Sequence, residues 1–307
     1  TTVLYITFTK GLPMIETRLL QYFLAIAHEE NITRAAESLH ITQSTLSKQM
    51  QELEKQIGKI LFIRGKRKIT LTEEGRYLQQ RGQEIIALVE TTESALKENQ
   101  ELLNGNIYFG CGETIQMNTI ISVFKGLQRI HPQIQFNMYT GDHIVIMDRL
   151  EKGLLDIGLV FEPQFKEGYD YMPLPDEDEF VLVLPKDDDL TKYSAIPREE
   201  LKTLPLILSR QGFVNPVDYE LFGTSRSALN ITATYNLINN ATYLVSQGIG
   251  YMLAISGLID MVGHPDLTTR PLERSMSGTW YVVTKQNQVF SPTAARFLAE
   301  LSTRIKG

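Results

Sequence analysis

The apolar residues of this chain follow two different spacings, and the change falls at residues 104–106. Before this point they recur every three or four residues, as along one face of an amphipathic α-helix. After it, short apolar runs alternate with helical segments, a pattern typical of parallel strands covered by helices. A chain of 307 residues is expected to form two or three folding units. The sequence therefore predicts an all-α N-terminal part and a larger α/β part.

Three amphipathic helices are predicted in the N-terminal part. The first covers Thr17–Glu29. Asn31 is expected to cap a short second helix over residues 32–39, and Thr42 a third helix that Gly58 ends. Two helices joined by a tight turn are typical of the helix-turn-helix, which places its second helix in the major groove of DNA.

The outer face of the third helix carries the candidate base contacts. On an isolated helix such a polar face indicates only exposure to solvent. In a helix-turn-helix, a glutamine matches adenine, a lysine matches the acceptors of guanine, and serines match phosphates or base edges. We therefore place the recognition helix in Gln43–Leu53. The predicted contacts are Gln43, Ser44, Ser47 and Lys48.

A basic turn between two short apolar runs predicts a β-hairpin over residues 61–71, the wing of a winged helix-turn-helix. Basic hairpin tips are usually only solvated, but one that follows a recognition helix is expected to contact backbone phosphates. The start of the second helix is expected to hold phosphate through its amides and charge. The predicted phosphate contacts are Thr33, Arg34, Arg64, Lys66, Arg67 and Lys68.

The distribution of charge favours this assignment. The whole chain carries a net charge of −6, which by itself argues against a nucleic-acid partner. Residues 14–71, however, hold nine basic and six acidic side chains, a net charge of +3. Residues 1–13 add one lysine, so the chain after residue 71 carries −10. The sequence predicts a basic head on an acidic body.

A long helix is predicted from the cap at Thr72 to about Leu103. Its apolar seam alternates four- and three-residue steps, as in a coiled coil that pairs two chains. The seam positions are Leu78, Gly82, Ile85, Val89, Thr92, Leu96, Asn99 and Leu103. Ile85, Val89 and Leu96 are the predicted dimerisation residues.

The C-terminal part is predicted to form two lobes with a cleft between them. The first series of strands and helices comprises Ile107–Cys111, Ile115–Ile130, Ile134–Tyr139, Ile144–Lys152 and Ile157–Phe161. The second comprises Phe180–Leu184, Pro205–Leu208, Ile231–Tyr235, Ala241–Gln247 and Gly250–Ile255. A late strand near Thr279–Thr284 and a helix from Pro292 are expected to return to the first sheet.

The turn Gly110–Thr114 lies between a strand and a helix, where exposed backbone amides favour an anion. It lacks the third glycine of a dinucleotide fingerprint, and a purely structural turn is the alternative. Cys111 alternates with Ile107 and Phe109, which favours a buried small hydrophobe over a sensor thiol. The acidic runs at 176–179 and 187–189 are interpreted as solvated loop charges.

Several function classes have no support in the sequence. The single cysteine permits no intrachain disulfide, the histidines lack metal-ligand spacing, and no catalytic constellation emerges, so we expect no cofactor, metal or enzymatic activity. No apolar run is long enough to span a membrane, and a cytoplasmic location is expected. Residues 1–13 fit no amphipathic pattern and are predicted to be a non-native or disordered leader.

Together these motifs resemble the LysR-type transcriptional regulators of bacteria, over essentially all of residues 14–307. In the N-terminal part the resemblance is carried by Arg34, Ala35, Ala36, Leu39, Gln43, Ser44, Leu46, Ser47, Lys48, Gln49, Leu53, Glu54, Gly58, Leu61, Phe62, Arg64, Leu71, Thr72 and Gly75. In the C-terminal part it is carried by Pro132, Gly141, Leu150, Gly153, Leu155, Asp156, Gly248, Ile249 and Gly250. Two departures are Lys48, where the family often has arginine, and Ser256, where it often has proline.

The resemblance implies a multi-domain chain. A winged helix-turn-helix would cover residues 14–71, a linker helix 72–104, and a two-lobed α/β effector domain, similar to periplasmic binding proteins, 105–307. Lobe I would cover about 105–175 and 274–307, and lobe II about 176–273. It also implies a homodimer or homotetramer that binds interrupted palindromic sites in double-stranded DNA and acts on RNA polymerase. The implied effector contacts are Thr114, Thr140, Phe161, Ser209 and Arg210.

The first hypothesis is therefore a DNA-binding regulator whose promoter binding or activation responds to a small molecule. Arg210 and the helix N-termini indicate a carboxylate or another anion, which is also the family's commonest effector. The second hypothesis is a small-molecule-binding protein or enzyme on the α/β part, with the head serving only assembly.

Overall fold

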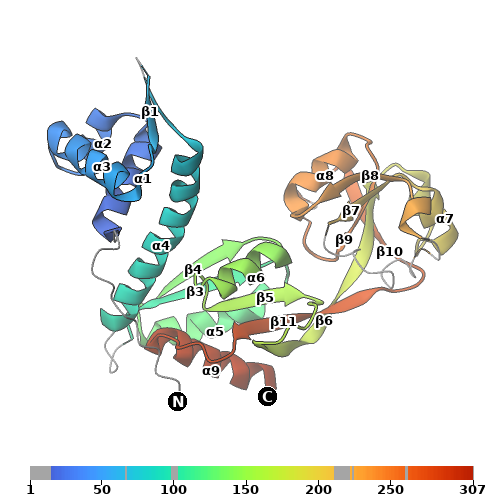
Figure 1. Cartoon of the computed structure of the whole chain (residues 1–307). Helices are drawn as coiled ribbons and strands as arrows, with labels where there is room; N and C mark the ends of the chain where they lie inside the picture. The colour runs from blue at the N-terminus through green and yellow to red at the C-terminus, as the bar shows by residue number, and fades with distance from the viewer. Residues whose placement is uncertain are drawn as a thin grey trace. The chain divides into compact units, whose positions relative to one another are not determined.

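The computed structural model in Figure 1 describes residues 15–65, 68–97, 103–210, 222, 225–259 and 262–306. The chain divides into two compact units, the first ending at Glu93 and the second beginning at Ser94. The predicted leader 1–13 and the wing residues Lys66 and Arg67 lie outside the described residues.

The three predicted helices of the head are confirmed as α1 (Thr17–Glu29), α2 (Ile32–Ser38) and α3 (Gln43–Ile57). The predicted caps are also confirmed: the side-chain oxygen of Asn31 accepts from the first amides of α2, and that of Thr42 accepts from the Thr45 amide. Gly58 ends α3 with a φ of 72°. The core of the head consists of Leu19, Phe23, Ile26, Ala35, Ala36, Leu46, Met50, Leu53 and Leu61.

The wing is a short antiparallel hairpin of β1 (Phe62–Arg64) and β2 (Ile69–Leu71). Three backbone amides of the wing segment donate hydrogen bonds to the helices. The Ile69 amide donates to the Glu30 carbonyl at the end of α1 (2.9 Å), and Oε1 of Glu54 in α3 accepts from the Leu61 and Phe62 amides (2.7 and 3.3 Å). The position of the wing is therefore set by hydrogen bonds from both α1 and α3.

The linker helix α4 (Glu73–Lys97) begins where the wing ends. Oγ1 of Thr72 accepts from the Gly75 amide (2.9 Å) and donates to the Ile60 carbonyl (2.8 Å). A Cβ on Gly75 would lie 2.2 Å from the Leu61 carbonyl oxygen, so the close approach of α4 to the wing requires glycine.

The predicted seam of α4 needs correction at both ends. Leu78 packs against the core of the head, and a Cβ on Gly82 would contact the side chains of Leu20 and Leu24 in α1. Leu103 is not helical and is buried in the core of the second unit. Residues 98–102 lie outside the described residues. Leu78, Gly82 and Leu103 thus face their own chain, and the prediction that the helix extends to Leu103 was wrong.

The first lobe of the second unit contains parallel strands in the order β4-β3-β5. Three aromatic rings pack at its centre. Phe109 of β3 and Phe136 of β4 stack on each other, and Phe297 of α9 packs edge-on against both. The strands are β3 (Asn106–Cys111), β4 (Gln135–Thr140) and β5 (Ile157–Phe161), and the helices are α5 (Met117–Ile130), α6 (His143–Glu151) and α9 (Pro292–Lys306).

Two strands connect this lobe to the next: β6 (Tyr169–Pro185) and β11 (Ser277–Lys285), which pair antiparallel between Tyr169–Glu179 and Ser277–Lys285. The remainder of β6 pairs with strands of the second lobe. Figure 1 shows both strands running between the lobes. The prediction of a strand over 180–184 was too short, and the acidic run 176–179 lies inside β6 rather than in a loop.

The second lobe has parallel strands in the order β9-β7-β8, and β6 pairs antiparallel with β9 and β10. Its strands are β7 (Leu206–Ser209), β8 (Ile231–Tyr235), β9 (Tyr251–Ile255) and β10 (Leu267–Pro271), and its helices are α7 (Arg198–Thr203) and α8 (Ile238–Ser246). The sequence did not predict α7 or β10. Apart from these and β6, the predicted elements of the second unit agree with the structure to within three residues.

Glu54→Ala is expected to loosen the wing, because two partly buried amides lose their acceptor, at a cost of about 1–3 kcal/mol. Hydrogen exchange measured by mass spectrometry should show faster exchange in the peptide that contains Leu61 and Phe62. Glu54→Gln keeps one oxygen acceptor and should have a smaller effect. Glu52→Ala, at an exposed position of the same helix, is the control. Equal exchange in all variants would contradict this role.

Candidate nucleic-acid interface and interlobe site

The N-terminal half of α3 presents a polar face to solvent. Gln43, Ser44 and Lys48 are exposed and Ser47 is partly buried, whereas Leu46 between them is fully buried. Within the part of the chain that the structure describes, Lys48 forms no ion pair with a carboxylate. The structure thus brings the four predicted base contacts together on one face.

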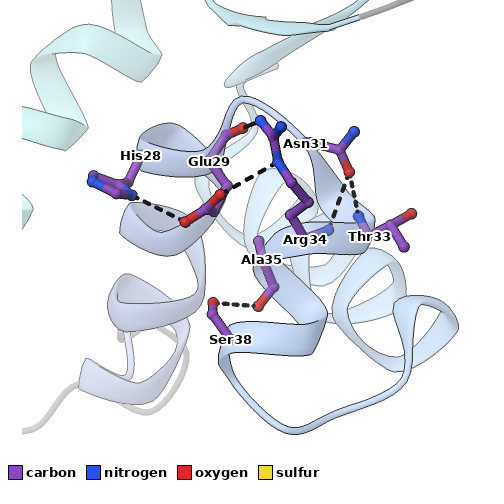
Figure 2. A network of polar contacts seen from close by, with 7 residues as sticks. All are labelled: His28, Glu29, Asn31, Thr33, Arg34, Ala35 and Ser38. Carbon is purple, nitrogen blue, oxygen red and sulfur yellow. Dashed lines mark hydrogen bonds and ion pairs between the residues drawn. The ribbon is translucent and has the colours of Figure 1, made fainter.

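The start of α2 is held by a polar network, shown in Figure 2. Oδ1 of Asn31 accepts from the amides of Thr33 (2.9 Å) and Arg34 (3.1 Å), so these amides are already used. The guanidinium of Arg34 donates to the Glu29 carbonyl (2.5 Å) and forms an ion pair with the Glu29 carboxylate (3.4 Å). The prediction that these amides hold phosphate is therefore not supported, and only the side chains of Thr33 and Arg34 are left as candidate contacts.

The described part of the wing has one ion pair. Nζ of Lys68 lies 3.1 Å from Oε2 of Glu30, and both side chains are more than half exposed. Exposed ion pairs contribute only about 0–1 kcal/mol, so a DNA phosphate can replace the Glu30 carboxylate at small cost. The side chain of Arg64, like Lys66 and Arg67, lies outside what the structure describes.

The middle and end of α4 leave large apolar side chains in solvent. Ile85 and Leu88 are each 43% exposed and Leu96 is 81% exposed, while Val89 is partly buried. Leu88 was not predicted, because it lies beside the four-and-three alternation that identified the seam. Apolar groups this exposed on a helix are typical of an interface with another chain.

Three predicted effector contacts lie at the carboxyl edge of the first sheet. In the register of the strands, Cys111 at the end of β3 pairs with Thr140 of β4 and Leu159 of β5, two residues before Phe161. Thr114 follows in the loop after β3. The carboxyl ends of parallel strands are where open α/β sheets bind ligands. Thr140 is exposed, but Thr114 is buried.

A buried carboxylate explains why Thr114 is inaccessible. Asp178 of β6 is only 2% exposed and accepts three hydrogen bonds. Oγ1 of Thr114 and Nε2 of Gln116 donate to it at 2.9 Å each, and Nε1 of Trp280 in β11 donates at 2.8 Å. The sequence interpretation of Asp178 as a solvated loop charge was wrong. The three donors lie far away in the sequence, so no local pattern indicated this network.

The carboxylate of Glu113 reaches the second lobe. It accepts hydrogen bonds from the Ile238 amide at the start of α8 and from Nδ2 of Asn239 (2.9 Å). A second contact between the lobes joins Arg210 Nη2 to Asp142 Oδ2 (3.2 Å). Arg210 was predicted from the sequence as a site residue, but Glu113, Asp142 and Asn239 were not.

The other two predicted effector residues end strands. The ring of Phe161 packs edge-on against Phe180 (centroids 5.7 Å apart) and Trp280 (5.3 Å). Ser209 is the last residue of β7 and pairs with Tyr235 of β8. The strand register and the ion pair with Asp142 bring Arg210 near the loop after Thr140.

Cys111 is a buried thiol in the core of the first lobe. Burial raises its pKa to about 11, and a hydrogen bond with Thr140 opposes this shift. The thiol is therefore protonated at neutral pH, as expected for a small core hydrophobe and unlike a reactive cysteine. Among the described residues, no three His, Cys, Asp or Glu side chains are grouped as metal ligands, and every helix is too short or too polar to cross a bilayer.

Two family models match the chain. One, described as the bacterial regulatory helix-turn-helix protein of the lysR family, covers residues 17–76, and the other, the LysR substrate binding domain, covers residues 100–306. The chain belongs to the LysR family. LysR proteins are DNA-binding transcriptional regulators with an effector-binding domain, so the hypothesis of an enzyme on the α/β part is excluded.

Relatives and solved structures agree with this LysR assignment. HcaR, the Hca operon transcriptional activator of Escherichia coli, is 26% identical over 95% of this chain and 98% of its own length. A probable RuBisCO transcriptional regulator of Porphyra purpurea is 32% identical over 75% of each chain. Full-length CbnR, solved with its target DNA, is similar in fold, with a TM-score of 0.71, 18% identity and coverage of 94% and 100%. The predicted order of winged head, linker helix and two-lobed effector domain is confirmed.

Proposed function

We propose that this LysR regulator binds an interrupted palindromic promoter site as a homodimer or homotetramer. Two copies of α3 read the half-sites, and a small anionic effector between the lobes changes transcription by RNA polymerase in the bacterial cytoplasm. The exposed face of Gln43, Ser44 and Lys48 on α3 carries the first part of this proposal, because polar side chains at the start of a recognition helix contact base edges.

Phosphate contacts are assigned to side chains around this face. Arg34 and Lys68 are held by Glu29 and Glu30 of the same chain, in ion pairs whose basic side chains are exposed. These pairs keep the basic side chains in place before DNA arrives and are weak enough to exchange for phosphate. Thr33, next to Arg34 in the sequence, and the basic residues Arg64, Lys66 and Arg67 complete the proposed set of phosphate contacts.

Lys48→Ala is expected to weaken binding to the promoter site by about five- to 150-fold, the equivalent of 1–3 kcal/mol for a base contact. Fluorescence anisotropy with the native site and with sites altered at single base pairs measures this loss. At a site that lacks the guanine read by Lys48, the variant and the parent should bind alike. Gln43→Ala should act in the same way at a different base pair.

Lys55→Ala is the matched control. Lys55 is exposed on the same face of α3, seven residues or about 10 Å further along the helix. It removes the same charge without removing a predicted base contact. If Lys48→Ala weakened all DNA sequences equally, Lys48 would be a phosphate contact, and base readout by this residue would be refuted.

The exposed apolar side chains of α4 support pairing of two chains. Ile85, Val89 and Leu96 were predicted to form the interface, and Leu88 extends it by one position. A coiled coil buries such side chains against a second helix. Leu78 and Gly82, which pack on the head, are not part of this interface.

Ile85→Asp is expected to produce a smaller assembly, because it would bury a charge against the partner helix. Sedimentation velocity of the full chain measures the size before and after the change, and also distinguishes a dimer from a tetramer. Gln83→Asp adds the same charge at an exposed position on the opposite face of α4 and should sediment like the parent. Identical sedimentation of all three chains would exclude α4 pairing through Ile85.

The proposed anionic effector is supported by the chemistry of the interlobe region. Thr140 and Ser209 place hydroxyl groups at the carboxyl ends of strands in the two lobes, and Arg210 contributes a positive charge that is 60% exposed. Thr114 is engaged with Asp178, and Phe161 packs on aromatic neighbours, so both are expected to shape the region more than to bind directly.

A carboxylate effector is expected to raise the melting temperature of the full chain, because binding to the folded state adds about 2.7 kcal/mol at one hundred times the Kd. Screening mono- and dicarboxylates by thermal shift, followed by run-off transcription, measures both binding and response. Arg210→Gln should reduce the shift, whereas Arg274→Gln, at an exposed position between β10 and β11, should not. An equal shift in Arg210→Gln would remove Arg210 from the site.

A further inference from the structure

The two lobes of the effector domain are joined by polar contacts of the chain's own carboxylates. We propose that Glu113 is a built-in latch that holds the lobes in the arrangement described above, and that an effector acts by releasing it. This inference rests on the proposed effector response, but the latch itself can be tested without DNA or effector.

Glu113 of the first lobe contacts the start of α8 in the second lobe. Leu237, the N-cap residue of α8, provides no side-chain cap. The Glu113 carboxylate supplies one from the other lobe, since it accepts from the Ile238 amide and from Nδ2 of Asn239. A carboxylate at this position also interacts favourably with the positive end of the helix dipole. Separating the lobes would leave the start of α8 without this cap.

Hydrogen bonds hold the loop that carries Glu113 in place. The residue after it, Thr114, and Gln116 both donate to the buried carboxylate of Asp178. Oγ1 of Thr114 also accepts from the Gln116 amide (3.0 Å), which closes the loop on itself. Glu113 is therefore fixed relative to β6, the strand that the two lobes share. Its side chain cannot follow α8 if the second lobe moves.

A second contact, between Asp142 and Arg210, also joins a carboxylate of the first lobe to a donor of the second lobe. Asp142 caps α6 of the first lobe through the Val145 amide (3.1 Å) and uses its other oxygen to bind Arg210 of the second lobe. In both contacts the first lobe supplies a carboxylate and the second lobe supplies the donors. An effector that changes the arrangement of the lobes must break these hydrogen bonds or exchange them for its own.

The latch is tested by measuring the distance between the lobes in the full chain. Spin labels at Gln128→Cys in α5 and Gln247→Cys after α8 occupy exposed positions in the two lobes. Double electron–electron resonance then gives the distance distribution, with excess unlabelled chain added so that only distances within one chain contribute. The parent chain, whose only cysteine is the buried Cys111, gives the background of labelling.

With Glu113 in place, a single narrow distribution is expected. Glu113→Ala should widen it and shift it to longer distances, and Asn239→Ala, which removes one donor from an exposed position, should produce a smaller shift in the same direction. Glu167→Ala removes an exposed carboxylate from the same lobe and should match the parent. Circular dichroism checks that each variant is folded.

If Glu113→Ala and Asn239→Ala both gave the parent distribution, the latch would be refuted. This result would leave the anionic effector untouched, because carboxylate binding is measured separately by thermal shift. Conversely, a released latch in a chain that no carboxylate stabilises would retain the inference and refute the proposed effector class.

Discussion

The effector domain depends on a single buried carboxylate, that of Asp178. Burial of a charge costs several kcal/mol unless hydrogen bonds replace the lost water. Here three neutral donors do so, from the loop after β3 and from β11, while Asp178 itself lies in β6. Because β6 and β11 are the strands that run between the lobes, the same interaction fixes both the crossover and the proposed effector loop. Loss of Asp178 would leave three buried donors unsatisfied.

The head is organised by a different balance of forces. Its apolar core and the caps of α2 and α3 are local, whereas Arg34 and Lys68 are held at the surface by the neighbouring Glu29 and Glu30. The core determines where α3 lies, and the weak pairs can exchange for phosphates. The charge of +3 on residues 14–71 thus acts within a rigid frame, even though the rest of the chain is acidic.

This difference explains what the sequence could predict. The head helices and caps depend on residues three or four positions apart, so their periodicity and the Asn31 and Thr42 signals sufficed. The first half of β6 contains two prolines and a run of acidic residues, which are typical of a loop. The hydrogen-bond donors that hold Asp178 in this segment lie 62 to 102 residues away in the sequence, so no local pattern predicts its position. Leu103 continues the apolar spacing of α4 in the sequence, but in the structure it is buried in the core of the second unit.

The polar nature of the latch decides whether an effector can release it. Each charge-assisted hydrogen bond contributes about 1.5–3 kcal/mol, and the exposure of Arg210 lowers the value of its pair further. A ligand shifts this balance by the difference between its affinities for the two arrangements, and a difference of about 10⁴-fold, roughly 5.5 kcal/mol, is comparable with the contacts of Glu113 and Asp142 together. The Asp178 network is buried and has three donors, so it is expected to survive. An effector can therefore change the lobe arrangement while the crossover strands keep their register.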